Sequence, residues 1–189
     1  NRSLSTDNNA KPTAWGTLVE RVAFDKMGMD YTLVSKERYY HSKFKEYWNG
    51  MPDLITKELI GDIKCPWTLK SFCKVVKSIR YYNKTKDISL FKKDHKEWYW
   101  QLVSYAIVCD RDKAIFVAYC PYKEDLEEIR DLAETHLGDG SNRFAFITWS
   151  DDEDLPYLMK DGKYNDINMM EFDIPQQDKD DLTARVEMA

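Results

Sequence analysis

Two carboxylates and one lysine lie in a short apolar segment, and together they could hydrolyse a phosphodiester bond. The segment is Trp48–Pro66 (WNGMPDLITKELIGDIKCP), and the three residues are Asp53, Asp62 and Lys64. Carboxylate oxygens are preferred ligands of Mg²⁺, and a bound cation can activate a water and stabilise charge on the phosphoryl oxygens. A neighbouring ammonium group can reach the attacking water or a phosphate oxygen. These residue types predict a metal-dependent site with Mg²⁺ or Mn²⁺ as its cofactor.

The same segment is predicted to form a β-hairpin that places these groups together. Asp53–Thr56 forms the outgoing strand, Lys57-Glu58 the turn, and Leu59–Cys65 the returning strand. Side chains two residues apart on a strand point to the same face, so Asp62 and Lys64 share one face. Asp62 can therefore bind a metal while Lys64 reaches the water or the phosphate.

The tripeptide Asp-x-Lys is not specific by itself. It also occurs at Asp94-His95-Lys96 and at Asp161-Gly162-Lys163. Only Asp62-Ile63-Lys64 lies in an apolar strand and follows a predicted hairpin partner with Pro52-Asp53. From spacing alone, a surface group of salt bridges stays an open alternative for these residues.

The net charge of −5 conceals a strong asymmetry along the chain. Residues 64–96 hold ten Lys or Arg against two Asp or Glu, whereas residues 122–189 hold seven basic against nineteen acidic residues. A local basic stripe is the electrostatic footprint that a polyanion needs. We predict that Lys70, Lys74 and Lys77 contact the DNA backbone. The alternative, that they form the solvated face of a helix, is compatible with this.

The length of 189 residues predicts a single domain over residues 1–189, and hydrophobic periodicity predicts a mixed α/β fold. A loose lead-in at residues 1–13, a polar connector at 80–96 and an acidic C-terminal extension at 150–189 complete the prediction. Helices are expected at residues 14–28, 68–79, 97–108 and 124–137 and from Asp178 on, and strands at 31–40, 113–119, 144–149 and 166–174.

Other site classes find little support in the sequence. The four cysteines stand far apart with no CxxC pair and no histidine at finger spacing, which argues against a structural zinc and favours reduced core residues. There is no run of about 18 apolar residues and no leader, so we expect no membrane association and a cytoplasmic protein. Because the sequence begins at Asn1, we expect a fragment or a trimmed form of something longer.

Four short motifs resemble one nuclease family in order and rough spacing. They are Glu20 in WGTLVE, Pro52-Asp53 in NGMPDLI, Asp62-Ile63-Lys64 in GDIKCP, and Gln101 in WYWQLVSYAIV. Over roughly residues 14–120 the chain resembles the YqaJ-type phage recombinase nucleases, which are relatives of the phage lambda exonuclease in the PD-(D/E)xK superfamily. The resemblance implies a restriction-endonuclease-like core, in which helices flank a central mixed sheet. It also implies digestion of double-stranded DNA from 5′ ends, a ring-shaped trimer, and a single-strand annealing protein as partner.

The resemblance also implies a role for each matching residue. Asp53 and Asp62 become metal ligands together with the carbonyl of Ile63, and Lys64 orients water and stabilises charge. Glu20 completes a second metal position, with a surface glutamate as the alternative. Gln101, with Tyr105 one turn later, lies against the active site, where Gln101 is a catalytic residue and Tyr105 contacts DNA, with simple packing of both as the alternative.

The sequence departs from the family's commoner pattern at two points. Asp62 stands where glutamate is usual, one methylene shorter, and for the arginine that grips a 5′-phosphate only Arg2 and Arg21 are upstream candidates. We predict a Mg²⁺-dependent deoxyribonuclease, a 5′-to-3′ exonuclease of DNA recombination or repair, acting in the host cytoplasm if phage-encoded. The alternatives are another nuclease of the superfamily, either RecB-like or an endonuclease, and a non-catalytic DNA-binding module with the same fold.

Overall fold

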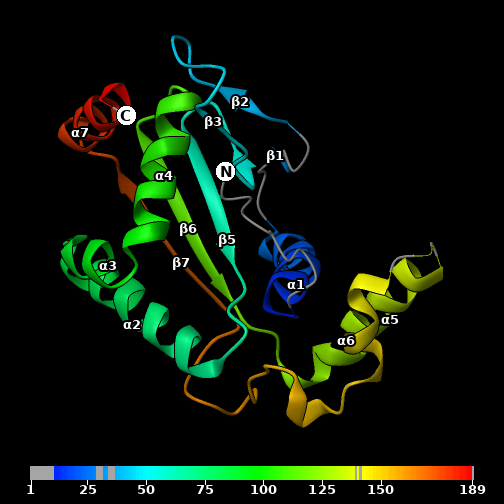
Figure 1. Cartoon of the computed structure of the whole chain (residues 1–189). Coiled ribbons are helices and arrows are strands. Elements are labelled where there is room, and N and C mark those ends of the chain that lie inside the picture. Colours follow the sequence, from blue (N-terminus) through cyan, green and yellow to red (C-terminus); the bar gives the residue numbers. More distant parts are fainter. Residues whose placement is uncertain (1–10, 29–31, 34–36, 139, 141, 189) are drawn as a thin grey trace. The chain divides into compact units, whose positions relative to one another are not determined.

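In the computed structural model, the described residues are 11–28, 32–33, 37–138, 140 and 142–188 (Figure 1). The chain divides into two compact units. The first comprises Asn1–Gly28, Lys64–Cys73 and Ala118–Ile167, and the second comprises Met29–Ile63, Lys74–Val117 and Asn168–Ala189. The single domain expected from the sequence stays a prediction.

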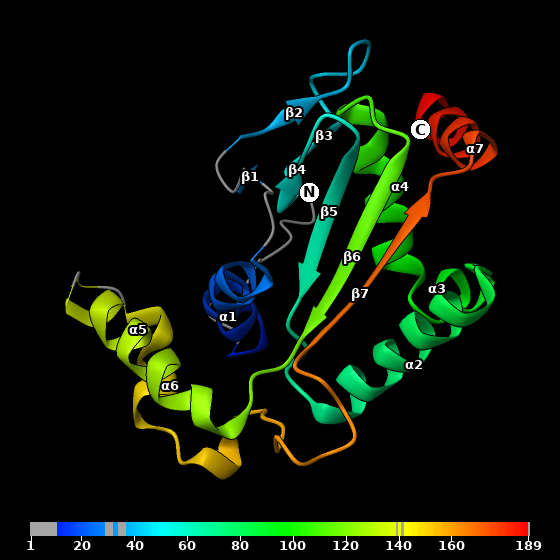
Figure 2. The same cartoon turned by 180° about the vertical axis from the view of Figure 1, so that it is seen from behind.

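A five-stranded sheet, which lies almost entirely in the second unit, has the strand order β1-β4-β5-β6-β7. The strands are β1 (Thr32–Leu33), β4 (Leu54–Ile55), β5 (Leu59–Lys64), β6 (Lys113–Tyr119) and β7 (Ile167–Asp173). β4 pairs antiparallel with both β1 and β5. The arrows of β5 and β6 run in the same direction and that of β7 in the opposite one, so the sheet is mixed (Figure 2).

The β4–β5 hairpin follows the prediction closely. Its register pairs Leu54 with Gly61 and Ile55 with Ile60. Thr56 closes the turn: its N–H donates to the Leu59 carbonyl at 2.9 Å, and its hydroxyl accepts the N–H groups of Glu58 and Leu59 at 3.2 and 3.1 Å. A threonine that binds backbone groups two and three residues ahead is a common way to fix a tight turn. The turn therefore sets the register that carries Asp62 and Lys64.

Gly61 allows β5 to approach its neighbours on both sides. A Cβ at this position would lie 2.9 Å from the Leu54 Cβ and 2.6 Å from the Ile115 Cγ2, on β4 and β6. Neither atom is at the far end of a flexible side chain, so any larger residue would shift the strand backbone. Because Gly61 directly precedes Asp62, this close approach also fixes the position of that carboxylate.

Helices α2 (Leu69–Thr85), α3 (Ser89–Asp94), α4 (Lys96–Val108) and α7 (Gln176–Glu187) accompany the sheet. α4 lies across one face of the sheet (Figures 1 and 2). Phe91 and Trp98 place their rings 4.8 and 5.5 Å from that of Phe116 on β6, and Tyr99 stacks on Phe172 of β7 at 6.1 Å. The predicted α/β class, a central mixed sheet flanked by helices, is confirmed.

The prediction of a polar connector at residues 80–96 is wrong. α2 continues to Thr85 because Tyr82, 8% exposed, extends the buried stripe three residues beyond Ile79. Asp87 then accepts the N–H of Ser89 at 2.9 Å, and α3 begins there, with Phe91 fully buried. The connector is therefore helical because two aromatic residues bury themselves within an otherwise polar sequence.

A buried carboxylate anchors α7 to the helices before it. Asp178 is 7% exposed, and its carboxylate accepts the Lys92 ammonium and the Tyr99 hydroxyl, each at 2.5 Å. Burial by itself raises the pKa of Asp178, but these two partners outweigh it, so the pKa is lowered overall. Asp178 is therefore held as an anion that joins α7 to α3 and α4.

The predicted strand at residues 31–40 is wrong as one continuous element. Residues 32–33 form β1, and residues 39–40 form β2 (Tyr39–Tyr40), which pairs antiparallel with β3 (Asn49–Gly50) in a separate two-stranded sheet. Residues 31 and 34–36 lie outside the described residues. The hairpin between β2 and β3 belongs wholly to the second unit.

The first unit is built around α1 (Lys11–Met27) and α5 (Leu126–Gly138), together with α6 (Ala145–Trp149) and three short 3₁₀ turns. The turns are η1 (Lys123–Asp125), η2 (Asn142–Phe144) and η3 (Asp152–Asp154). α1 ends at Gly28, whose φ of +57° suits glycine, as predicted. Residues 1–10 of the predicted lead-in lie outside the described residues.

Two predictions about the first unit are wrong. Residues 11–13 are helical, because Pro12 lies in the first turn of α1, where a missing N–H is tolerated. Residues 144–149 form η2 and α6 instead of a strand, because Phe144 and Ile147 bury side chains three residues apart. A short apolar run does not distinguish a buried strand from a buried helical turn.

The four cysteines are free thiols, and all but the half-buried Cys73 are buried, in agreement with the predicted core role. Burial raises the pKa of Cys109 to about 11 and that of Cys120 to about 12, so both stay protonated at neutral pH. No helix among the described residues combines the length and the apolar composition that crossing a bilayer requires. A cytoplasmic location stays a prediction.

Candidate active site

The β4–β5 hairpin brings the Asp53 carboxylate against the backbone of β5. The Asp53 N–H donates to the Gly61 carbonyl at 3.0 Å, and Asp53 Oδ2 accepts the Ile63 N–H at 2.7 Å. The Asp53 side chain therefore touches the peptide that joins Asp62 to Ile63. This contact fixes one predicted ligand next to the backbone of the second.

Asp62 is deeply buried, with 1% of its surface exposed, and Ile63 beside it is 2% exposed. Carboxylates are seldom found at such depth, because desolvation penalises the charged form unless hydrogen bonds or a cation offset it. Lys64 ends β5 and is half-buried. Strand alternation places it on the same face as Asp62, so the predicted pairing of carboxylate and ammonium agrees with the observed strand.

The predicted ligands on the hairpin offer hard oxygen donors to a cation. They are the carboxylates of Asp53 and Asp62 and the main-chain carbonyl of Ile63, a set that suits Mg²⁺ or Mn²⁺ and does not suit a thiophilic metal. Within the part of the chain that the structure describes, no three His, Cys, Asp or Glu side chains gather into a metal-holding group. The donor chemistry thus fits the predicted cofactor, and the metal itself stays a prediction.

Gln101 and Tyr105 lie together on one face of α4. The Gln101 Nε2 donates to the Tyr105 hydroxyl at 2.6 Å, and both residues are half-buried. Gly50 of β3 lies against the same tyrosine, since a Cβ there would come within 2.6 Å of the Tyr105 Cδ1. The place of Gln101 and Tyr105 against the active site and the contact of Tyr105 with DNA stay predictions.

Glu20 lies on α1 in the first unit and is half-buried. Its position at the edge of the buried stripe agrees with the predicted helix, because Val19 and Ala23 nearby are fully buried. Arg21 is exposed on the same helix, and Arg2 lies outside the described residues. The roles of Glu20 in metal binding and of either arginine in phosphate binding stay predictions.

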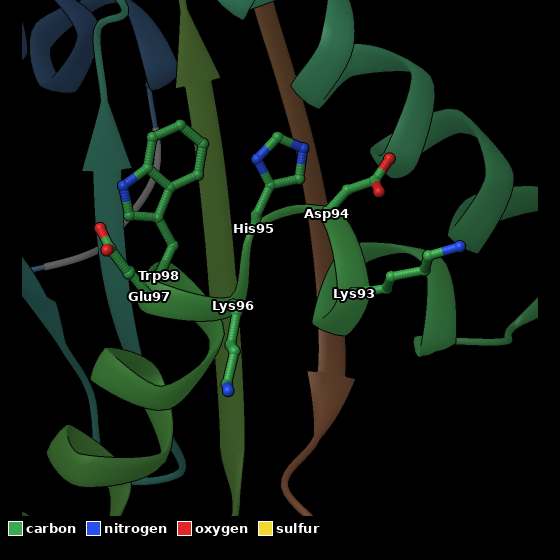
Figure 3. A pocket seen from close by; sticks show the side chains of 6 residues that line it. All are labelled: Lys93, Asp94, His95, Lys96, Glu97 and Trp98. Atoms are coloured by element: carbon green, nitrogen blue, oxygen red, sulfur yellow. The ribbon is translucent and has the colours of Figure 1, made fainter.

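The first competing Asp-x-Lys match spans the junction of α3 and α4. Asp94, His95 and Lys96 line a pocket of about 340 Å³, in which the side chains of Asp94 and Lys96 point in different directions (Figure 3). The His95 ring stacks on that of Trp98 at 4.9 Å, and burial, with the nearby Lys74 charge, lowers the pKa of His95. A helix junction does not give residues two apart a common face, so this match lacks the geometry of β5.

The second competing match, Asp161-Gly162-Lys163, lies in an exposed turn of the first unit. The Gly162 N–H donates to the Met159 carbonyl at 2.9 Å, which closes the turn. Of the three matches, only Asp62-Ile63-Lys64 lies on a strand with a second carboxylate across a hairpin. The context that separates the three motifs in the sequence is therefore present in the structure.

The basic residues of α2 form one exposed face. Lys70, Lys74 and Lys77 are all exposed and lie four and three residues apart, and the helix contains no acidic residue. Lys74 Nζ donates to the Asp94 carbonyl at 3.3 Å. This face has the charge that a phosphate backbone requires, and its contact with DNA stays a prediction.

The β2–β3 hairpin at residues 37–51 carries none of the predicted site residues. Its sequence, ERYYHSKFKEYWNGM, holds five aromatic and three basic residues beside two glutamates, which is the signal that could have drawn attention to it. Trp48 is buried and its Nε1 donates to Ser104 Oγ on α4 at 2.8 Å. The hairpin is thus fixed to the same helix that carries Gln101 and Tyr105.

No protein-family model matches the chain, and no curated protein matches it. Among solved structures, an alkaline exonuclease from Laribacter hongkongensis is similar with a TM-score of 0.49 and 14% identity over 94% of this chain and 64% of the other. A phage-related exonuclease from Haemophilus somnus 129PT is similar with a TM-score of 0.49 and 16% identity, over 93% of this chain and 67% of the other. The chain therefore spans about two thirds of the length of these proteins. The functional assignment rests on the residues of the hairpin.

Proposed function

We propose that this chain is a metal-dependent deoxyribonuclease that hydrolyses phosphodiester bonds of duplex DNA. The observation that carries the proposal is the 2.7 Å hydrogen bond from the Ile63 N–H to Asp53, which joins the two predicted carboxylate positions in one hairpin. Asp53, Asp62 and the Ile63 carbonyl would hold Mg²⁺ or Mn²⁺. Glu20 would complete a second metal position.

A bound divalent cation would supply charge stabilisation at the phosphoryl oxygens and a water of lowered pKa. The protein's own groups then act by position. Asp53 is oriented by its hydrogen bond, Asp62 is buried on β5, and Lys64 lies on the same face of that strand as Asp62. From there Lys64 can donate to the attacking water or to a phosphate oxygen.

The finer assignment follows the motif resemblance. We propose a 5′-to-3′ exonuclease used in DNA recombination or repair, acting in the cytoplasm as a ring-shaped trimer with a single-strand annealing protein. Gln101 and Tyr105 would contact the substrate beside the metal site, and Lys70, Lys74 and Lys77 would contact its phosphates. These assignments depend on the order and spacing of the motifs at Glu20, the hairpin and Gln101.

The decisive experiment compares the three Asp-x-Lys lysines. Lys64→Ala should reduce single-turnover cleavage of a labelled linear duplex by roughly a hundredfold or more, because a charge positioned at the transition state is lost. Lys96→Ala and Lys163→Ala should retain nearly full activity, since their aspartates lack a carboxylate across a hairpin. Circular dichroism should show the same folded spectrum for all three variants.

Two further arms define the reaction. Cleavage should require Mg²⁺ or Mn²⁺ and stop in EDTA, and activity that persists in EDTA would overturn the metal assignment. A covalently closed circle should survive, and its rapid linearisation would point to an endonuclease instead. Metal-independent DNA binding with no cleavage by the unmodified protein would identify a non-catalytic binding module. Equal rates for Lys64→Ala and the unmodified protein would remove the central assignment.

A further inference from the structure

The β2–β3 hairpin exposes aromatic rings between basic side chains. Tyr40 is 54% and Tyr47 64% exposed. Arg38, Lys43 and Lys45 are also exposed and interleave with them in the sequence. Isolated exposed apolar side chains are ordinary on protein surfaces. Two open aromatic rings and three cations, with two exposed carboxylates at Glu37 and Glu46, give this short hairpin side chains that can stack on bases and contact phosphates.

The side chains that close the hairpin loop are mainly those of His41, Phe44 and Trp48, and the Tyr47 ring lies 5.5 Å from that of Phe44. The His41 N–H donates to the Trp48 carbonyl at 2.9 Å, and His41 Nδ1 accepts the N–H groups of Lys43 and Phe44, both at 3.1 Å. The His41 ring stacks on Trp48 at 4.5 Å and on Phe44 at 5.0 Å. The loop is thus closed chiefly by these contacts, while Tyr40 and Tyr47 remain more than half exposed to a ligand.

The base of the hairpin is fixed to α4 on the inner side. Trp48 is buried and bound to Ser104, and the backbone of Gly50 lies directly against the ring of Tyr105. No side chain larger than glycine's hydrogen fits between that backbone and the ring unless one of them moves. The hairpin is therefore a rigid support for its exposed rings, which lowers the entropy lost when a ligand binds.

The hairpin also leads directly into the candidate active site. Gly50 ends β3, and Asp53 follows three residues later. The Cα atoms of these two residues can therefore be about 11 Å apart at most, which is the length of three fully extended residues. The surface with the exposed tyrosines and the first predicted metal ligand thus belong to one short, continuous segment.

We infer that residues 37–51 form a stacking platform for single-stranded DNA. Tyr40 and Tyr47 stack on unpaired bases, and Arg38, Lys43 and Lys45 contact the phosphates between them. Lys43 also forms a 3.0 Å ion pair with Glu187, but both side chains are largely exposed, and such a pair readily exchanges for a phosphate. The choice of DNA as the nucleic acid rests on the proposed function.

The test measures binding of a fluorescein-labelled single-stranded oligonucleotide of about 20 nucleotides in EDTA, where no metal-dependent cleavage occurs. The double variant Tyr40→Ala, Tyr47→Ala should bind roughly tenfold more weakly or worse, because two base-stacking contacts are lost. Tyr40→Phe, Tyr47→Phe should bind within about threefold of the unmodified protein, since the ring supplies the contact. Thermal unfolding should be unchanged in both variants.

Trp149→Ala provides the matched control, because this aromatic residue is 74% exposed on α6, outside the hairpin. It should bind the oligonucleotide as the unmodified protein does. Unchanged binding by the double alanine variant, or an equal loss in Trp149→Ala, would overturn the inference. Tighter binding of an RNA of the same sequence would overturn the choice of DNA. Because no cutting is required, loss of the nuclease proposal leaves this result unaffected, and the reverse also holds.

Discussion

The hydrogen bond between Asp53 and Ile63 allows structure and catalysis to be separated at one residue. In the unmodified protein the Ile63 N–H donates to the Asp53 carboxylate at 2.7 Å. In Asp53→Asn the amide oxygen of the new side chain can still accept this hydrogen bond, but the side chain no longer carries a negative charge. In Asp53→Ala the acceptor is absent, so the N–H of Ile63, a residue that is 2% exposed, loses its hydrogen-bond partner. The two variants therefore differ in the hydrogen bond and share the loss of the metal-binding charge.

The expected magnitudes follow from these contacts. A hydrogen bond to a charged acceptor contributes about 1.5–3 kcal/mol and a neutral one about 0.5–1.5 kcal/mol, so Asp53→Asn should lose about 1 kcal/mol of unfolding free energy. Asp53→Ala leaves a buried donor without its acceptor, which costs about 1–3 kcal/mol. A domain of ordinary stability, about 5–15 kcal/mol, stays almost fully folded after either loss.

Cleavage should respond quite differently. Both variants should cut a labelled linear duplex at least a hundredfold more slowly in Mg²⁺, which corresponds to about 3 kcal/mol of lost transition-state stabilisation. Urea unfolding followed by circular dichroism measures stability, and single-turnover cleavage measures the chemical step. Full activity of Asp53→Asn would refute the ligand role. A cleavage rate that only follows the folded fraction would show that Asp53 is structural.

Two further predictions concern the anchor of α7 and the basic face of α2. Asp178→Asn should lower the unfolding free energy by about 2 kcal/mol at pH 7, a value reduced because Lys92 is partly exposed. The lowered pKa of Asp178 means that this stabilisation is present above its unfolded pKa, about 4, and is lost as pH falls through the folded value. Urea midpoints from pH 7 to pH 3 should therefore fall less steeply in the variant, and parallel curves would contradict the assignment. Replacing Lys70, Lys74 and Lys77 with alanine should reduce the salt slope of duplex binding by roughly 0.9 per lost phosphate contact, whereas an unchanged slope would show a merely solvated face.

The hairpin and the central strands could be predicted from the sequence because their signals are local. Two short apolar runs, beginning at Leu54 and at Leu59, and the polar turn Lys57-Glu58 between them predict the hairpin without reference to the rest of the chain. β6, whose residues 114–119 are all buried, is a continuous apolar run of the kind that an interior strand requires. Local pattern and tertiary environment agree at these positions.

The errors arise where the tertiary environment decides. Tyr82 and Phe91 bury their rings within polar surroundings, so α2 and α3 extend into a region that composition predicts to be a connector. The strand expected at residues 144–149 is wrong for a related reason. Its five apolar residues fit both the helical period and the strand period, and only packing against the rest of the protein decides between the two. The anchoring of Trp48 on Ser104 joins segments 56 residues apart, and no local pattern predicts it.

The three Asp-x-Lys tripeptides show why secondary structure determines whether a motif can form a site. On β5, Asp62 and Lys64 share a face of the strand. Gly61 lets β5 lie close to β4, and Asp53 accepts the Ile63 N–H across the hairpin. At Asp94 the same spacing crosses a helix junction, where the side chains diverge (Figure 3). At Asp161 it lies in an exposed turn. The same residue types at the same spacing can therefore act together only where the strand period and a close neighbouring strand both constrain them, and only β5 offers both.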